Sequence, residues 1–306
     1  MKTLLLSFTA LIGLIIYGSN RNPVPESRDI YDLRKTNYIP YFLEIYKADS
    51  LLILNKDQEA FQKLDSLFKI YSPINQLTYS EMLNYVLLSE KLDKRIDSKK
   101  YIESLIRDWG VKVKELKKES ILNSVLKKNF SDTELLALEQ QHMKNIDWEY
   151  RKVLKEMFTA DQSSRGKQEE PEIDESNIKK LIHLIQTKGY PDIPTVGKIA
   201  DDGIMLPLMY FHIGRAEEYK ELKALVLENI KKGKATPFEI KQLIQAKYHL
   251  AYGQDYFQQT NQSATNPRRI KTTYPKDTFS IRRNKIGLPS LEYEKWKNSL
   301  MGLNNN

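Results

Sequence analysis

Apolar residues recur with the period of an α-helix along most of this chain, and that pattern limits what it can fold into. Between residues 60 and 71 the apolar side chains lie mostly three or four positions apart, on one face of a helix. Similar spacing continues from Tyr38 to Tyr252, and the 306 residues include only 12 Gly and 12 Pro. Because Gly and Pro weaken helix interiors, the sequence predicts an all-α fold.

The charge pattern argues against a nucleic-acid partner. The net charge is +8, but acidic residues alternate with basic ones nearly everywhere. Dense basic clusters occur only at residues 268–271 and 282–285. Dispersed charge of this kind is typical of solvated helix surfaces, so no nucleic-acid binding is expected.

Several kinds of chemistry are excluded or disfavoured by the residue inventory. The chain has no cysteine, which rules out disulfides, thiolate catalysis, cysteine-bound zinc and a cysteine-linked lipid anchor. Its four histidines, at positions 142, 183, 212 and 249, are far apart in the sequence. Glycine-rich phosphate loops and the G-x-S-x-G turn do not occur. No metal and no cofactor are therefore expected.

The first twenty residues have the features of an export signal. Lys2 precedes an apolar run over residues 3–17, and small and polar residues follow at Gly18-Ser19-Asn20. The run is shorter than the roughly 20 apolar residues of a spanning helix. Residues 1–20 are therefore interpreted as a cleaved signal peptide or an uncleaved inner-membrane anchor, with a buried core helix as a third reading. Both leading interpretations place the protein outside the cytoplasm, either periplasmic or secreted.

The rest of the chain divides into four predicted parts. Residues 21–37 read as a linker, and residues 38–129 as helical hairpins whose size resembles tetratricopeptide repeats, although irregular hairpins fit as well. Residues 130–262 form a predicted compact helical domain. Residues 263–306 read as a polar, basic, extended tail that ends in a short helix near residues 292–300.

Local signals predict where several helices begin and end. One long helix is expected from Ser131 to Met157, an acidic loop over residues 162–175, and a buried helix over residues 203–214. Asp174 is expected to cap the helix after the loop. Capping boxes, in which a Ser or Thr precedes a Glu by three positions, are predicted at Thr78/Glu81, Ser131/Glu134 and Thr236/Glu239.

One group of polar residues stands out as a candidate site. Asp161, Gln162 and Arg165 follow the long helix, and Asp161 and Arg165 are spaced for an i,i+4 ion pair. The structural interpretation is a salt bridge at a helix end. His212 ends an apolar segment and is either a buried, hydrogen-bonded histidine or a base tuned by a nearby carboxylate. His142 is expected to be a core histidine, and His183 and His249 to be exposed.

The region from Asp147 to Gln259 resembles a bacterial family of exported domains of unknown function. The matching segments are Asp161-Gln162-x-x-Arg165, Gly189-Tyr190-Pro191 (Gly-Trp-Pro in the family), Thr195-Val196-Gly197, His212 after Phe211 (Gln-His in the family) and Tyr256 to Gln259 (Tyr-Gly-Thr-Gln in the family). The resemblance implies a helical domain whose polar residues, Gln259 included, cluster at one site. It also implies a structural role for Gly189, Tyr190, Pro191 and Gly197. The family's Asp-Arg pair is replaced here by Lys247-Tyr248, which puts part of that site in doubt.

Three functions compete. The first is an exported protein-interaction or structural module of the bacterial envelope with an unknown protein partner. The second is an extracytoplasmic enzyme or small-ligand binder that uses Asp161, Arg165, His212 and Gln259. In it, Arg165 would hold an anionic group and His212 would act as a base. The third is attachment to an anionic surface through the basic tail.

Overall fold

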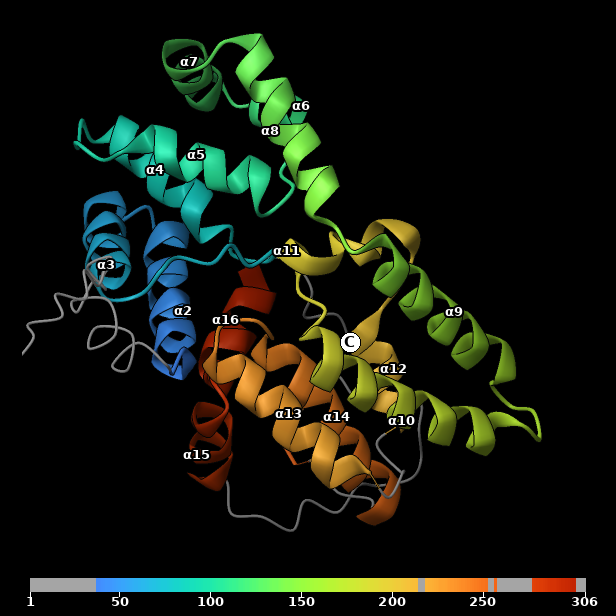
Figure 1. Cartoon of the computed structure of the whole chain (residues 1–306). Helices are drawn as coiled ribbons and strands as arrows, with labels where there is room; N and C mark the ends of the chain where they lie inside the picture. The colour runs from blue at the N-terminus through green and yellow to red at the C-terminus, as the bar shows by residue number, and fades with distance from the viewer. Residues whose placement is uncertain (1–36, 214–217, 253–255, 258–276, 301–306) are drawn as a thin grey trace, which may run out of the picture. The chain divides into compact units, whose positions relative to one another are not determined.

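The computed structural model describes residues 37–213, 218–252, 256–257 and 277–300. Within these ranges it contains fifteen α-helices, one 3₁₀-helix and no strand, which confirms the all-α prediction (Figure 1). The proposed leader and nearly all of the predicted linker lie outside them. In the described ranges, no helix has the length and apolarity that crossing a membrane requires.

The N-terminal helices form the predicted hairpins. In chain order they are α2 (Ile39–Ile53), α3 (Asp57–Ile70), α4 (Glu81–Lys91) and α5 (Ser98–Arg107). Helices α2 and α3 pack together across the short connection 54–56, and α4 packs against both α3 and α5. The apolar face predicted for α2 is buried, with Tyr41, Phe42 and Ile45 each no more than 1% exposed. That these hairpins are true repeats remains a prediction.

Next come three helices that build a second apolar cluster. They are α6 (Val113–Leu116), α7 (Ser120–Asn129) and α8 (Asp132–Asn145). Ser131 and Glu134 form the predicted capping box at the start of α8. His142, on α8, is the predicted core histidine: its Nδ1 lies 3.0 Å from the Arg107 carbonyl oxygen. Its ring packs so closely on Gly110 that a Cβ there would lie 2.3 Å from Nε2.

The long helix predicted from Ser131 to Met157 is in fact two helices. Helix α8 stops at Asn145, and α9 (Trp148–Ser164) starts after Ile146 in an extended conformation. The break occurs because the Asp147 side chain accepts the Tyr150 N–H and caps α9. Helical periodicity alone does not reveal such a break, since the apolar positions continue in phase across it.

The remaining helices of the predicted second domain surround a buried core. They are α10 (Glu170–Lys188), α11 (Ile193–Val196), η1 (Ile199–Asp202), α12 (Leu206–His212), α13 (Tyr219–Lys231) and α14 (Pro237–Tyr252). The apolar segment 203–214 thus contributes a shorter helix than predicted. The acidic loop is shorter too, because α10 starts at Glu170 and holds Asp174 within it instead of being capped by it.

The prediction of an extended tail is wrong for residues 277–285, which form α15 (Asp277–Lys285) packed against α2. The short terminal helix predicted near residues 292–300 is present as α16 (Leu291–Leu300). Arg283, one of the basic residues assigned to the tail, is fully buried and donates to the carbonyl oxygens of Pro289 and Phe257. Arg283 can be buried because these carbonyl groups accept its hydrogen bonds. A count of charges along the sequence does not reveal such partners.

The two apolar clusters do not follow the predicted domain boundary at residues 129 and 130. The larger cluster combines side chains of α2 and α3 with side chains of α9 to α14, and Leu288. The smaller one extends from Met82 to Leu135. The described residues accordingly belong to one compact unit. The aromatic side chains of α2 and α3 are buried against the helices that were assigned to the second domain.

Candidate functional site

The structure brings together four of the five residues predicted to form a polar site. The Asp161 carboxylate is fully buried and lies 2.9 Å from Nδ1 of His212. It also accepts hydrogen bonds from Gln162 Nε2 at 2.6 Å and from Arg165 Nη2 at 2.7 Å. Gln259 lies outside the described residues. The pairing of Asp161 with His212, 51 positions apart, is what the sequence interpretation required.

Arg165 is committed to its protein partners. Its Nε–H donates to the Asp161 carbonyl oxygen, and its Nη2 donates to the carboxylates of Asp161 and Asp174. Its Nη1 donates to Glu170 and Asp174. A guanidinium has five N–H groups, and these five bonds use all of them. The expectation that Arg165 holds an anionic ligand is therefore not supported by the geometry: the residue ties the end of α9 to α10.

His212 is oriented by a buried carboxylate but lies beside no described hollow. Its side chain is 17% exposed, and the edge of its ring meets Phe211. A carboxylate that holds one imidazole nitrogen leaves the other available, an arrangement that suits a base. However, neither of the two hollows described in the structure is lined by His212, Asp161 or Arg165. In the described part of the chain, this group is thus a buried polar network at a helix end.

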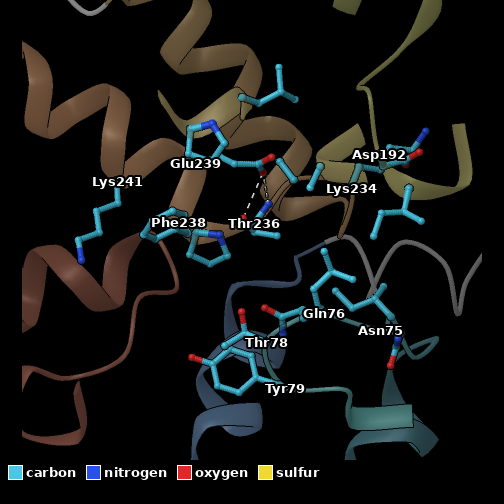
Figure 2. A pocket seen from close by; sticks show the side chains of 18 of the residues that line it. Asn75, Gln76, Thr78, Tyr79, Asp192, Lys234, Thr236, Phe238, Glu239 and Lys241 are labelled. Carbon is cyan, nitrogen blue, oxygen red and sulfur yellow. Dashed lines mark hydrogen bonds between the residues drawn. The ribbon is translucent and has the colours of Figure 1, made fainter. Parts of the chain in front are cut away.

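A large cavity lies elsewhere, between the segment 74–79 and the start of α14 (Figure 2). Its volume is about 800 Å³. Other walls come from the stretch 190–207, which includes α11 and η1, and from α16. Aromatic and aliphatic side chains predominate in the lining: Tyr46, Ile74, Leu77, Tyr79, Trp109, Tyr190, Pro191, Ile193, Ile199, Ile204, Met205, Leu206, Pro207, Pro237, Phe238, Leu288, Pro289 and Tyr293.

Three of these apolar side chains are exposed to solvent. Leu77 is 58% exposed, Met205 53% and Phe238 51%. They come from three separate segments and line the same cavity. Grouped exposed apolar side chains beside a hollow are characteristic of binding sites.

Glu239 places a carboxyl group in the wall of the cavity. Its Oε2 accepts the Thr236 N–H at 2.6 Å, which is one half of the predicted capping box, and the Thr236 hydroxyl donates to it at 3.2 Å (Figure 2). The other half is not formed, because the Glu239 N–H donates to the Thr236 carbonyl oxygen. Tyr190 also hydrogen-bonds to it, and the Tyr190 hydroxyl lies 2.9 Å from that of Tyr210. Burial raises the pKa of Glu239 to about 7, against hydrogen bonds from Thr236 and Tyr190 that lower it. The side chain is only partly accessible, yet it lines the cavity and can gain or lose a proton near neutral pH.

Asp192 contributes a second carboxyl group to the lining. Its side chain caps α11 by accepting the Thr195 N–H at 3.0 Å. Burial raises its pKa, while Thr195 and the positive charge of Lys234 lower it. The charge on Asp192 in turn raises the pKa of Glu239. Two carboxyl groups that disfavour each other's ionisation therefore occupy one region of the cavity.

The opposite wall depends on a third buried carboxyl group, that of Glu81. The predicted capping box with Thr78 is wrong, because α4 starts at Glu81 itself, after Ser80 in a left-handed conformation. The carboxylate turns inward, accepting the Gln76 N–H at 3.0 Å and lying 3.2 Å from the Tyr41 hydroxyl. It thereby fixes the segment 74–76. Burial raises the pKa of Glu81 to about 8.

Two lysines in the lining have acidic partners. Lys297 of α16 lies 2.9 Å from Asp49, and Lys241 of α14 lies 3.6 Å from Glu294. These pairs fasten α16, and with it Tyr293, along the cavity. Glu294 is also the ion-pair partner of the buried Arg283, so on this side three cationic groups share two carboxylates.

Sequence reasoning located parts of this cavity without recognising it. Gly189 has a φ of +87° and Gly197 a φ of +69°, consistent with the structural role that the resemblance implies. A Cβ at Gly197 would lie 2.7 Å from Arg151 Nη1. Tyr190 and Pro191, taken only as structural, line the cavity. His183 is exposed as predicted, whereas His249 is half-buried.

Comparison of the chain with family models, with curated proteins and with solved structures gave no significant match. The resemblance to an exported domain family therefore remains a prediction.

Replacing Glu81 with Gln should change how stability depends on pH. The folded protein keeps the Glu81 proton up to about pH 8, whereas an unfolded chain releases it near pH 4.5, so wild-type stability falls as pH rises between these values. The variant should lack this contribution, which is at most ~4 kcal/mol between pH 5 and pH 8. Urea unfolding across that range measures it, with Glu149→Gln at the surface as control. Parallel profiles for wild type and Glu81→Gln would contradict the assignment.

Replacing Asp161 with Asn should destabilise the protein by about 3 kcal/mol, because an amide removes the negative charge that Arg165 and His212 share and replaces one acceptor oxygen with an N–H donor. The exposed ion pair of Glu228 and Lys232 provides the control, since Glu228→Gln should have no measurable effect. Both are read from urea unfolding at neutral pH. A loss below 1 kcal/mol for Asp161→Asn would show that the network contributes little.

Proposed function

We propose that this protein is an exported binder of a small, mostly apolar molecule, which it holds in the cavity between the segment 74–79 and α14. The observation that supports this best is the cavity itself, with its apolar lining and its few polar groups on the walls. Ligand sites are typically apolar hollows of roughly 300–1,000 Å³ with a small number of placed polar groups. The volume of about 800 Å³ falls in that range.

The lining favours binding over covalent chemistry. Among the described residues that line the cavity there is no histidine, serine or cysteine. The Thr236 hydroxyl is engaged by Glu239. The ligand-binding hypothesis from the sequence is thus kept, but its site moves from Asp161 and His212 to the cavity. The role as a protein-interaction module remains a prediction from the sequence alone.

Export is proposed from residues 1–20 and is tested by fractionating a bacterial host that expresses the full chain. The protein is expected in the periplasmic or membrane fraction. N-terminal sequencing should find a start close to Asn20 if the leader is cleaved, or Met1 in the membrane fraction if it serves as an anchor. Recovery from the cytosol with the first twenty residues intact would contradict export.

Binding in the cavity is tested with N-phenylnaphthylamine, an uncharged fluorophore that brightens in apolar surroundings. We expect saturable binding of one equivalent, weakened at least about tenfold by Phe238→Asp, because a charge at the opening opposes entry of an apolar body. Ile281→Asp on α15 is the matched control, since Ile281 is 55% exposed and does not line the cavity. Equal loss in both variants, or no saturable binding by wild type, would refute the proposal.

A further inference from the structure

We propose that the ligand carries a protonated amine on its apolar body, and that Glu239 receives this group. The inference rests on the proposed function, because it requires the cavity to be a ligand site. It adds the chemical class of the ligand and the residue that recognises it.

The cavity lining contains several hydrogen-bond acceptors, and one of them, on Asn75, has no partner among the described residues. Glu239 and Asp192 each present a carboxyl group, and Asn75 also lines the cavity. Asn75 is 5% exposed, and its Oδ1 is buried without a hydrogen-bond partner among the described residues. Buried acceptors without donors are costly, so a ligand that supplies donors is favoured. An ammonium group supplies three donors and accepts none.

The charges around Glu239 also favour a cationic ligand group. The groups that face it are Thr236, Tyr190 with Tyr210 behind it, and Asp192. None of these described groups is a cation, and the charged one is acidic. Lys234 partly offsets the charge of Asp192, while Lys241 and Lys297 are held by Glu294 and Asp49. A cation that enters next to Glu239 and Asp192 relieves their repulsion, whereas an anion increases it.

The aromatic lining suits a cation as well. Tyr190 and Trp109 belong to the walls. The faces of aromatic rings attract ammonium groups. Two other rings of the lining already show this, with the Lys297 ammonium 4.5 Å from the centre of the Tyr79 ring and the Lys241 ammonium 5.9 Å from the centre of the Phe238 ring. The cavity therefore provides both a counter-ion and aromatic faces for an amine.

The experiment compares three probes that share one apolar body: naphthylethylamine, naphthylethanol and naphthylpropionate. Calorimetric titration of the full chain at pH 8 should show the amine binding at least about tenfold tighter than the alcohol, and the carboxylate weakest. Glu239→Gln should lower the affinity for the amine to that of the alcohol, with both probes measured on the same variant. Urea unfolding of Glu239→Gln beside wild type reports whether the variant is folded.

A measurement on wild type alone supplies a second readout. Burial raises the pKa of Glu239 to about 7 and also raises that of Asp192, whereas an alkylamine stays protonated up to about pH 10. The preference for the amine should therefore grow by up to about tenfold from pH 6 to pH 8 as Glu239 ionises. In Glu239→Gln, the preference for the amine should change with pH only by the contribution of Asp192. The substitution Asp192→Asn should remove that contribution.

The outcomes separate this inference from the function on which it rests. If the alcohol or the carboxylate binds as tightly as the amine, the cavity binds ligands but the amine assignment is wrong. If Glu239→Gln retains the preference for the amine, Glu239 is not the recognising residue and the inference fails. If none of the three probes binds, the proposed function fails as well.

Discussion

The cavity depends on the way in which the buried carboxyl group of Glu81 is held. Tyr41 of α2 and the backbone of Gln76 surround it, and together they fix the otherwise irregular segment 74–76 against the core. A carboxyl group removed from water is tolerated only with such partners, or in its neutral form, and its raised pKa shows that both apply. Without this anchor the segment that forms one wall of the cavity, which belongs to no helix, would keep the hydrogen bonds between Tyr41 and the Ile74 backbone but lose those at Gln76.

The polar cluster around Asp161 and the pair of carboxyl groups in the cavity wall differ in whether their hydrogen-bonding capacity is used up. Around Asp161, each N–H of Arg165 has an acceptor, and the carboxylate itself is fully buried. Such a network can stabilise the junction of α9 and α10 but offers Arg165 no means of binding another molecule. Glu239 and Asp192 instead line a cavity, where Lys234 partly offsets the charge of Asp192 and that charge disfavours ionisation of Glu239. Polar groups that have unused hydrogen-bonding capacity and lie beside a cavity distinguish a candidate site from a structural network.

The C-terminal helices link the cavity to the N-terminal hairpin. Tyr46 of α2 donates to the Gly287 carbonyl oxygen at 2.8 Å, and Asp49, also on α2, binds Lys297 of α16. Residues separated by some 240 positions in the chain thereby form adjoining walls. Because the first and last described helices both contribute, the site requires nearly the whole described chain.

The sequence by itself determined the helices and the faces they bury, because a period of 3.6 residues is a local property. It also placed Asp161 and Arg165 on one helix face and indicated the turn at Gly189. It could not show that α8 and α9 are separate helices, because the hydrogen bond of Asp147 that separates them leaves the spacing of the apolar residues unchanged. Nor could it show that Arg283 of the basic tail is buried. Partners distant in the chain, such as Glu81 with Tyr41, become neighbours only when helices pack. Only the tertiary structure decided where the cavity lies, because a cavity is the space that side chains from distant segments leave between them, and no single segment encodes it.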